Sequence, residues 1–187
     1  MSTEDRQAKI NEALNLHQGG RINEALALYE TLVVEAESNA HLLYLLGTAY
    51  YQIYKFPDAE RMLRRSLEID PQQAGAHSNL GLVLEGFQRY NEALVSYDAA
   101  IKINPNFSGA LSNRGSVLRQ MGRLNEALKS FEAAIAAKPD YAEAYYNKGL
   151  IFQDLQDLSL AIQSYDQALA LEPNYAEAYC NRGNAPT

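Results

Sequence analysis

Asparagine recurs along this chain at a constant spacing, and its side chain is suited to hydrogen bonding with a polypeptide backbone. Asn79, Asn113, Asn147 and Asn181 are 34 residues apart, and Asn11 lies two such steps before Asn79, with Leu45 between. A primary amide carries donors and an acceptor together. Each residue of an extended peptide offers the complementary pair. Regularly spaced amides of this kind indicate a surface that binds a peptide by its backbone.

We find no residue pattern that indicates catalysis or a bound ion. His17, His41 and His77 lack the spacing of metal ligands. Cys180 has no histidine nearby that would activate it as a nucleophile. A phosphate-binding glycine loop followed by Gly-Lys-Ser or Gly-Lys-Thr is absent from the sequence. We therefore expect no catalytic residues, no metal and no cofactor, and a function other than that of an enzyme.

The whole chain repeats with the same period of 34 residues. The period is clearest in four prolines: Pro71, Pro105, Pro139 and Pro173. It predicts five units, at 6–39, 40–73, 74–107, 108–141 and 142–175. Residues 1–5 are then an N-terminal tail, and 176–187 are a partial sixth unit that contains a first helix only. Below, a place is counted from the first residue of each unit.

Each unit is expected to form two helices that pack closely. The asparagine in the recurring Arg-x-Asn-Glu turn is predicted to cap the second helix, as at Asn23, Asn91 and Asn125. The proline ends that helix, because the residue before proline is disfavoured in the α region. Small residues let the helices approach, at Gly81, Gly115 and Gly149 and at Ala93, Ala127 and Ala161. Large rings fill the space beside them, at Tyr97, Phe131 and Tyr165.

These positions resemble the tetratricopeptide repeat (TPR). The resemblance rests on the period, on small residues at the eighth and twentieth places, on an aromatic residue at the twenty-fourth and on proline at the thirty-second. The chain departs from the pattern because no tryptophan stands at the fourth place, and because the first unit has Glu37 instead of proline. The resemblance implies an all-α, right-handed solenoid of stacked antiparallel helix pairs, with first helices lining its concave wall. It also implies a protein-interaction scaffold.

On that wall, the asparagines of the sixth place are predicted to form a ladder. Neighbouring first helices should lie about 10 Å apart, and an extended chain rises about 3.3 Å per residue. One asparagine would then meet every third residue of a bound peptide, and would read the peptide's sequence only weakly. The alternative is that each asparagine caps or braces the neighbouring repeat.

Apolar and basic residues near the asparagines are further candidates for peptide binding. Those on or near the wall are expected to be anchors or to pack within the superhelix: Tyr44, Leu82, Tyr146 and Leu150. Arg114, Lys148 and Arg182 follow ladder asparagines directly, and form either a basic strip for an acidic segment or solvated edge charges. The resemblance also argues against one ligand class. The lysine and asparagine with which chaperone-binding members grip a terminal carboxylate are missing from the fifth and ninth places.

Charge and composition exclude other classes of partner. The chain has 187 residues and a net charge of −7, with its basic residues scattered. Nucleic acids and anionic membrane surfaces favour contiguous basic patches, so both are disfavoured. No stretch approaches the roughly 20 apolar residues that cross a bilayer, so we expect no membrane insertion. The single cysteine suits a reducing compartment, which favours the cytoplasm.

Two alternatives to a simple scaffold remain. The stretch 175–183 and the asparagine ladder resemble the repeat arms of O-linked N-acetylglucosamine transferases, in which the arm presents substrate to a separate glycosyltransferase domain. The chain would then be the substrate-recruiting arm of a larger enzyme. The other alternative is a self-assembling array, since Tyr179 and Gly183 keep the packing pattern in a unit that lacks a second helix. Its incomplete C-terminal end would form a homo-oligomer.

Overall fold

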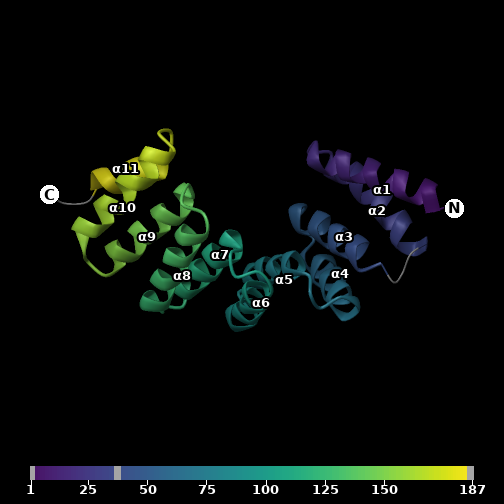
Figure 1. Ribbon diagram of the computed structural model, residues 1–187, viewed down its shortest axis with the longest axis horizontal. Coiled ribbons are helices and arrows are strands. Elements are labelled where there is room, and N and C mark those ends of the chain that lie inside the picture. Colours follow the sequence, from purple (N-terminus) through teal and green to yellow (C-terminus); the bar gives the residue numbers. More distant parts are fainter. Residues whose placement is uncertain (1–2, 36–38, 185–187) are drawn as a thin grey trace. The chain divides into compact units, whose positions relative to one another are not determined.

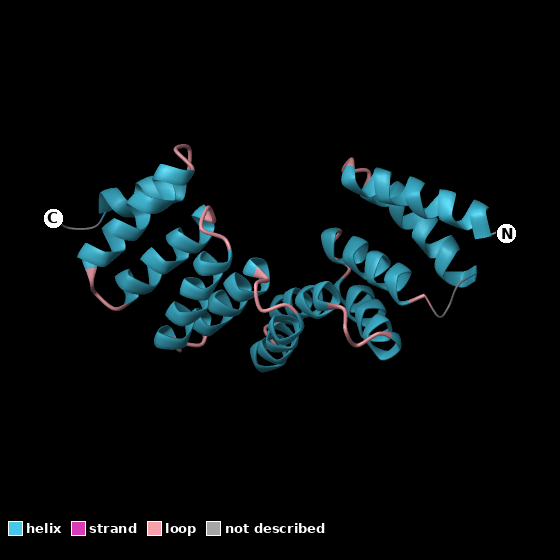
Figure 2. Cartoon of the chain, in the orientation of Figure 1, coloured by secondary structure: helices cyan, strands magenta, loops and turns pink. Residues whose placement is uncertain are grey.

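The computed structural model describes residues 3–35 and 39–184, which are helical with short turns and contain no strand (Figures 1 and 2). The described residues form α1 (Thr3–Gln18), α2 (Ile22–Glu35), α3 (Ala40–Gln52), α4 (Phe56–Ile69), α5 (Ala74–Gly86), α6 (Tyr90–Ile103), α7 (Ser108–Gln120), α8 (Leu124–Ala137), α9 (Ala142–Asp154), α10 (Leu158–Leu171) and α11 (Ala176–Asn184). The predicted all-α class is therefore confirmed. Part of the predicted tail, from Thr3 to Asp5, already belongs to α1, while Glu37 and 185–187 lie outside the described residues.

The chain divides within α6 into two compact units, Met1–Ser96 and Tyr97–Thr187. In the first unit α1 packs on α2 and α3 on α4, while α2 contacts α3 and α4 contacts α5. In the second unit α7 pairs with α8 and α9 with α10, while α8 contacts α9 and α10 contacts α11. First helices of successive pairs also touch, α3 with α5 and α7 with α9. Each unit is thus a stack of helix pairs.

The second helices end where the prolines predict. α4, α8 and α10 each stop two residues before a proline, and the intervening residue leaves the helical conformation. Asp70, Lys138 and Glu172 have φ of −134°, −142° and −131°, with ψ near 90°. Steric contact with the following proline ring disfavours the α region at these residues. Proline therefore ends these helices, as predicted.

The predicted asparagine caps are wrong. α2, α6 and α8 begin one residue before Asn23, Asn91 and Asn125, so these asparagines lie inside the first turn. The arginine of the motif stands at the cap of α8 and makes no side-chain cap there. It pairs instead with the glutamate three residues later, where the Nε–Oε1 distance is 2.8 Å for Arg123 and Glu126. Residues three apart share a helix face, so the motif encodes an ion pair rather than an asparagine cap.

The first helices end on a residue in the left-handed conformation. The fifteenth place of the 34-residue repeat has φ between 58° and 75° in all five repeats: Gly20, Tyr54, Gln88, Gly122 and Gln156. The next backbone N–H then reaches back to the last turn, as from Arg123 N to Leu118 O at 2.9 Å. This bond closes the helix end. Residues other than glycine lose roughly 1–2 kcal/mol in this conformation, so three of the five turns are strained.

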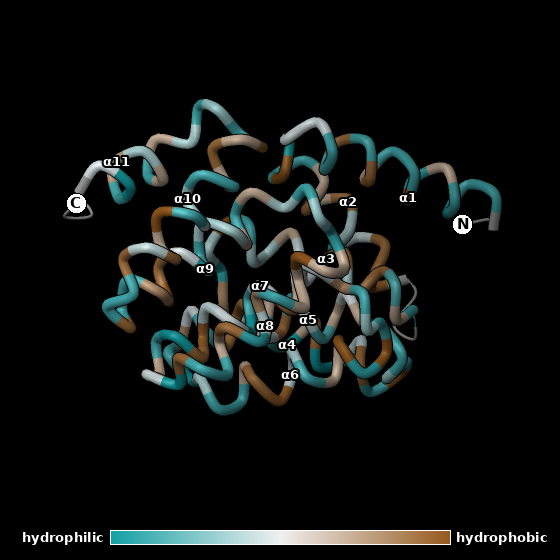
Figure 3. Tube along the Cα trace, turned by 60° about the vertical axis from the view of Figure 1, so that its left-hand side comes forward, coloured by the Kyte–Doolittle hydropathy of each residue, from teal (hydrophilic) through white to brown (hydrophobic). Residues whose placement is uncertain are grey.

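The core forms between the small residues and the large rings, as predicted. Tyr97, Phe131 and Tyr165 are completely buried. A Cβ atom at Gly115 would lie 2.8 Å from Phe131 Cζ, and one at Gly149 would lie 2.4 Å from Tyr165 Cε1. The rings therefore rest directly on glycine backbone. Hydrophobic and hydrophilic stretches alternate along the helices, as Figure 3 shows, because each helix has one buried and one solvated face.

Candidate functional site

The asparagine of α5 braces two first helices of the first unit. Asn79 Nδ2 donates to Thr48 Oγ1 on α3 at 2.8 Å, and Thr48 Oγ1 donates to the carbonyl of Tyr44 at 2.8 Å. These two bonds fix the orientation of the Asn79 amide. Its Oδ1 atom makes no hydrogen bond to any described residue and remains an acceptor.

The asparagine of α11 makes a similar brace in the second unit. Asn181 Nδ2 donates to the hydroxyl of Tyr146 on α9 at 3.0 Å. The Tyr146 ring packs against Tyr175 and Tyr165, with centroid separations of 4.9 and 5.8 Å. Burial in this cluster raises the pKa of Tyr146. The bracing interpretation therefore holds for Asn79 and for Asn181, each of which joins its helix to the preceding first helix.

Asn147 of α9 differs from these two. Its side chain is half-buried and makes no hydrogen bond with the residues that the structure describes. The Ser116 hydroxyl of the preceding first helix donates to Ser112 O at 3.3 Å, as Thr48 does to Tyr44 O, but it accepts no hydrogen bond from Asn147. The whole Asn147 amide is thus available to a ligand. Asn113 of α7 is half-buried as well.

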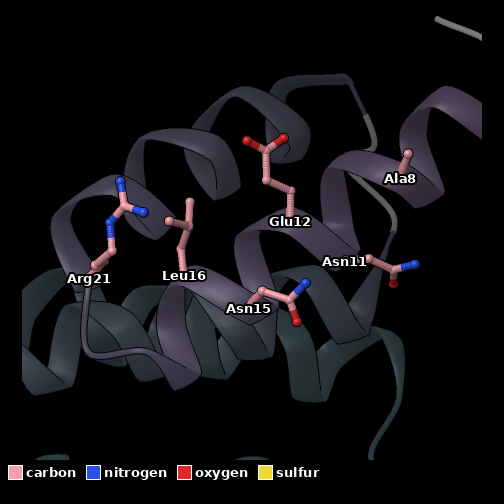
Figure 4. Close-up of a pocket in the computed structure, with 6 residues that line it drawn as sticks. All are labelled: Ala8, Asn11, Glu12, Asn15, Leu16 and Arg21. Carbon is pink, nitrogen blue, oxygen red and sulfur yellow. The ribbon is translucent and has the colours of Figure 1, made fainter.

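Asn11 of α1 lies apart from the other asparagines. It is exposed and accepts from Gln7 Nε2 at 3.1 Å. With Asn15, Glu12 and Arg21 it helps to line a hollow of about 490 Å³ on α1 and the following turn (Figure 4). Arg21 is exposed there and paired with Glu24. The lining of this hollow includes no other residue of the predicted site.

Three predicted anchors lie on first helices that carry a ladder asparagine, whereas Tyr44 lies on α3, where Leu45 takes that place. Tyr44 is half-buried, and Gly75 of α5 leaves room for its ring, since a Cβ atom there would lie 3.1 Å from Tyr44 Oη. Leu82 and Leu150 are half-buried three residues after Asn79 and Asn147, and residues three apart share a helix face. The structure thus brings Tyr146 and Asn181 together in the second compact unit and joins Asn79 to the helix that carries Tyr44 in the first, while Leu82 and Leu150 share only a helix face with their asparagines.

The predicted basic residues are paired within the chain. Arg114 Nε lies 2.6 Å from Asp98 Oδ1, and Arg114 Nη1 donates to Ser130 Oγ at 2.7 Å. Lys148 Nζ lies 3.2 Å from Glu132 Oε1. The seventh place is turned by about 100° from the asparagine on a helix, which directs it towards the preceding second helix. These two residues therefore do not form the free basic strip that was predicted for an acidic segment.

The acidic partners belong to a repeating charge pattern that the sequence motifs above do not predict. Asp98, Glu132 and Asp166 each precede a basic residue by 16 positions, and Arg182 pairs with Asp166 in the same way. The recurrence of opposite charges at this spacing is the signal by which the sequence could have revealed them. First helices are also joined by an ion pair, Arg119 Nε to Asp154 Oδ2 at 2.6 Å.

Two other kinds of feature are missing from the described part of the chain. Among those residues, no three His, Cys, Asp or Glu side chains gather as metal ligands do. No described helix combines the length and apolarity that crossing a bilayer requires.

The fold and the sequence both match known proteins. YrrB, described as a TPR protein with an unusual peptide-binding site, is 26% identical over 94% of this chain and 90% of its own, with a TM-score of 0.75. TTC0263, described as a thermophilic TPR protein of Thermus thermophilus, is 20% identical over 96% of this chain and 98% of its own, with a TM-score of 0.76. PilF of Pseudomonas aeruginosa is 22% identical over 97% of this chain and 87% of its own, with a TM-score of 0.80.

Sequence comparison agrees with the structural one. No curated protein sequence gave a significant match. Family models described as tetratricopeptide repeat match residues 16–81, 74–107 and 96–129. A further model, described as TPR repeat, matches 115–156 and 149–185. Together these matches run from residue 16 to residue 185. The chain therefore belongs to the tetratricopeptide repeat family, whose repeats form protein-interaction scaffolds.

Proposed function

We propose that this scaffold binds an extended segment of a partner protein along its first helices, by hydrogen bonds from the sixth-place asparagines. The observation that carries the proposal is the amide of Asn147, which is half-buried yet unbonded to any described residue. An amide that has no partner within the chain can exchange its water for the N–H and C=O groups of a peptide backbone. The peptide-binding site described for YrrB supports this class of ligand.

The asparagines have two roles in this proposal. Asn79 and Asn181 already use one N–H to brace neighbouring helices, so each presents its oxygen to a peptide N–H. Asn147 offers both its N–H groups and its oxygen. Leu82 and Leu150 lie beside these amides and contact the ligand's side chains. The backbone contacts set affinity with little dependence on the ligand's sequence.

The test separates binding from folding. A peptide is selected from a random displayed library, and its affinity is measured by calorimetry. Asn147→Ala should weaken it by roughly two- to twelvefold, the value of one hydrogen bond of about 0.5–1.5 kcal/mol, without lowering the urea midpoint. Asn79→Ala should lower both affinity and stability because it also removes the brace. Asn125→Ala, an exposed asparagine on α8, is the matched control. Equal affinity in all three variants would refute the proposal.

The two alternatives make different predictions for the same preparation. A substrate-recruiting arm of a glycosyltransferase should select peptides rich in serine and threonine acceptors; sequences without such enrichment count against it. Self-association is suggested by Tyr179 on α11, which is 53% exposed. If the chain self-associates, its sedimentation coefficient should rise with concentration. A sedimentation coefficient that stays at the monomer value excludes self-association.

A further inference from the structure

Four aromatic rings gather in the first unit, away from the asparagines described above. Tyr51 is the second-last residue of α3. Tyr54 lies in the turn that follows, Phe56 is the first residue of α4, and Phe87 follows α5. Phe56 is at the centre, with ring centroids 5.8 Å from Tyr51, 6.0 Å from Tyr54 and 5.9 Å from Phe87. The turns of two successive repeats thus contribute to one aromatic patch, defined here as Tyr51, Tyr54, Phe56 and Phe87.

A local exception in the repeat makes room for this patch. Gly86 stands at the thirteenth place, where the other described first helices carry glutamine or aspartate: Gln18, Gln52, Gln120 and Asp154. A Cβ atom at Gly86 would lie 3.3 Å from Phe56 Cε2. The Phe56 ring therefore rests on the Gly86 backbone and bridges the two repeats. A longer side chain at this place would push it away.

Tyr54 has a strained backbone, and little packing of its side chain compensates for the strain. Its φ is 60°, in the left-handed region where the equivalent residues Gly20 and Gly122 are unstrained. Its side chain is 81% exposed, so core packing returns little of that cost. Phe87 is also exposed, at 37%. Strained residues and exposed aromatic rings are both concentrated at binding surfaces, and here they coincide.

From this coincidence we infer that the aromatic patch is a second docking surface, and that its occupant is a proline-rich segment in the polyproline II conformation. Proline rings pack on flat aromatic faces, and such segments dock on aromatic-lined surfaces. Proline has no N–H, so its carbonyls need donors. The phenols of Tyr51 and Tyr54 can supply them. So can the Gln52 amide, because its Oε1 is already hydrogen-bonded to His17 Nε2 at 2.8 Å and its N–H groups remain.

The experiment uses the whole chain and an acetylated, amidated decaproline peptide in calorimetry. Tyr54→Gly should weaken decaproline binding by at least about tenfold, as loss of an aromatic anchor does. The same change should raise the urea midpoint by relieving the strain, so misfolding cannot explain the loss. Gln156→Gly is the matched control, since Gln156 has φ of 62° at the equivalent place. It should raise the midpoint and leave binding unchanged.

Other outcomes overturn the inference. Decaproline that does not bind the unaltered chain, or binds Tyr54→Gly equally well, refutes it. An amphipathic leucine-rich peptide bound through Tyr54 in place of decaproline would assign the patch to a helical partner instead. Asn147→Ala must leave decaproline affinity unchanged; a loss there would place the peptide on the first-helix site. The aromatic patch can thus fail its test while the proposed binding by the asparagines stands, and the asparagine site can fail while the aromatic patch stands.

Discussion

Replacing Gly149 by alanine tests the packing that holds each helix pair together. The new Cβ atom would lie 2.4 Å from Tyr165 Cε1 and 2.6 Å from Cδ1. Ordinary carbon contacts are about 3.5–4.0 Å, so the ring or the helix must move by about 1 Å. The ring is not free to move, because it is completely buried and its hydroxyl donates to Gln153 Oε1 at 2.7 Å.

The expected change is the difference between two opposing terms. Overpacking a core costs about 1–3 kcal/mol, and a displaced ring also loses a hydrogen bond of about 0.5–1.5 kcal/mol. Alanine returns about 1 kcal/mol, since glycine is the poorer helix former. The free energy of unfolding should therefore fall by about 0.5–3.5 kcal/mol. Gly183→Ala is the matched control, because it has the same repeat place and nothing lies within 4 Å of its Cβ position.

Urea denaturation followed by circular dichroism measures both variants. Gly183→Ala should leave the midpoint unchanged or slightly raised, and Gly149→Ala should lower it. The urea midpoint of Gly115→Ala should lie between those of the other two variants, since its Cβ would lie 2.8 Å from Phe131 Cζ. If Gly149→Ala is as stable as Gly183→Ala, the second helix shifts freely and the close-approach reasoning is refuted.

Two further predictions concern pH and the asparagine brace. Burial raises the pKa of three tyrosines to about 12, namely Tyr29, Tyr50 and Tyr165. The pKa of these tyrosines in the unfolded chain is about 10, so the stability that they contribute is complete below pH 10 and is lost as pH rises from 10 through 12. Tyrosinate absorbance should therefore rise together with loss of helix. Ionisation of these tyrosines near pH 10 without unfolding would contradict this. Thr48→Val removes the acceptor of Asn79 at nearly constant volume and should cost about 1–2 kcal/mol in urea. Unchanged stability would show that the Asn79–Thr48 bond contributes nothing.

The repeat period predicts the helices well because it arises from packing. Proline fixes the end of each second helix, and glycine with a facing ring fixes the contact between helices. Gly149 and Tyr165 show both ends of this contact in the structure. These constraints act within a few residues or across one helix pair, so they can be read from a single sequence.

Contacts between successive repeats are harder to predict. The asparagines of the second-helix turns have the residue type of a cap, but the helices start earlier and the arginine pairs with glutamate. Arg114 and Lys148 have the charge of a binding strip, yet they meet acids 16 residues earlier. Each error has the same cause. A residue's type shows which partners suit it, whereas the rotation of its helix decides which partner it reaches.

The same rotation divides the asparagines in a way that the sequence hides. At the sixth place, an asparagine braces its helix when the preceding first helix offers an acceptor within reach, as Thr48 and Tyr146 do. Ser116 lies at the place of Thr48 and, like Thr48, donates within its own helix. It accepts no hydrogen bond from Asn147, which is left without a brace. Bracing preorganises an amide and reduces the entropy lost on binding, but it uses one donor. If the asparagines bind a peptide as proposed, the braced positions couple stability to affinity, whereas at Asn147 the two vary independently.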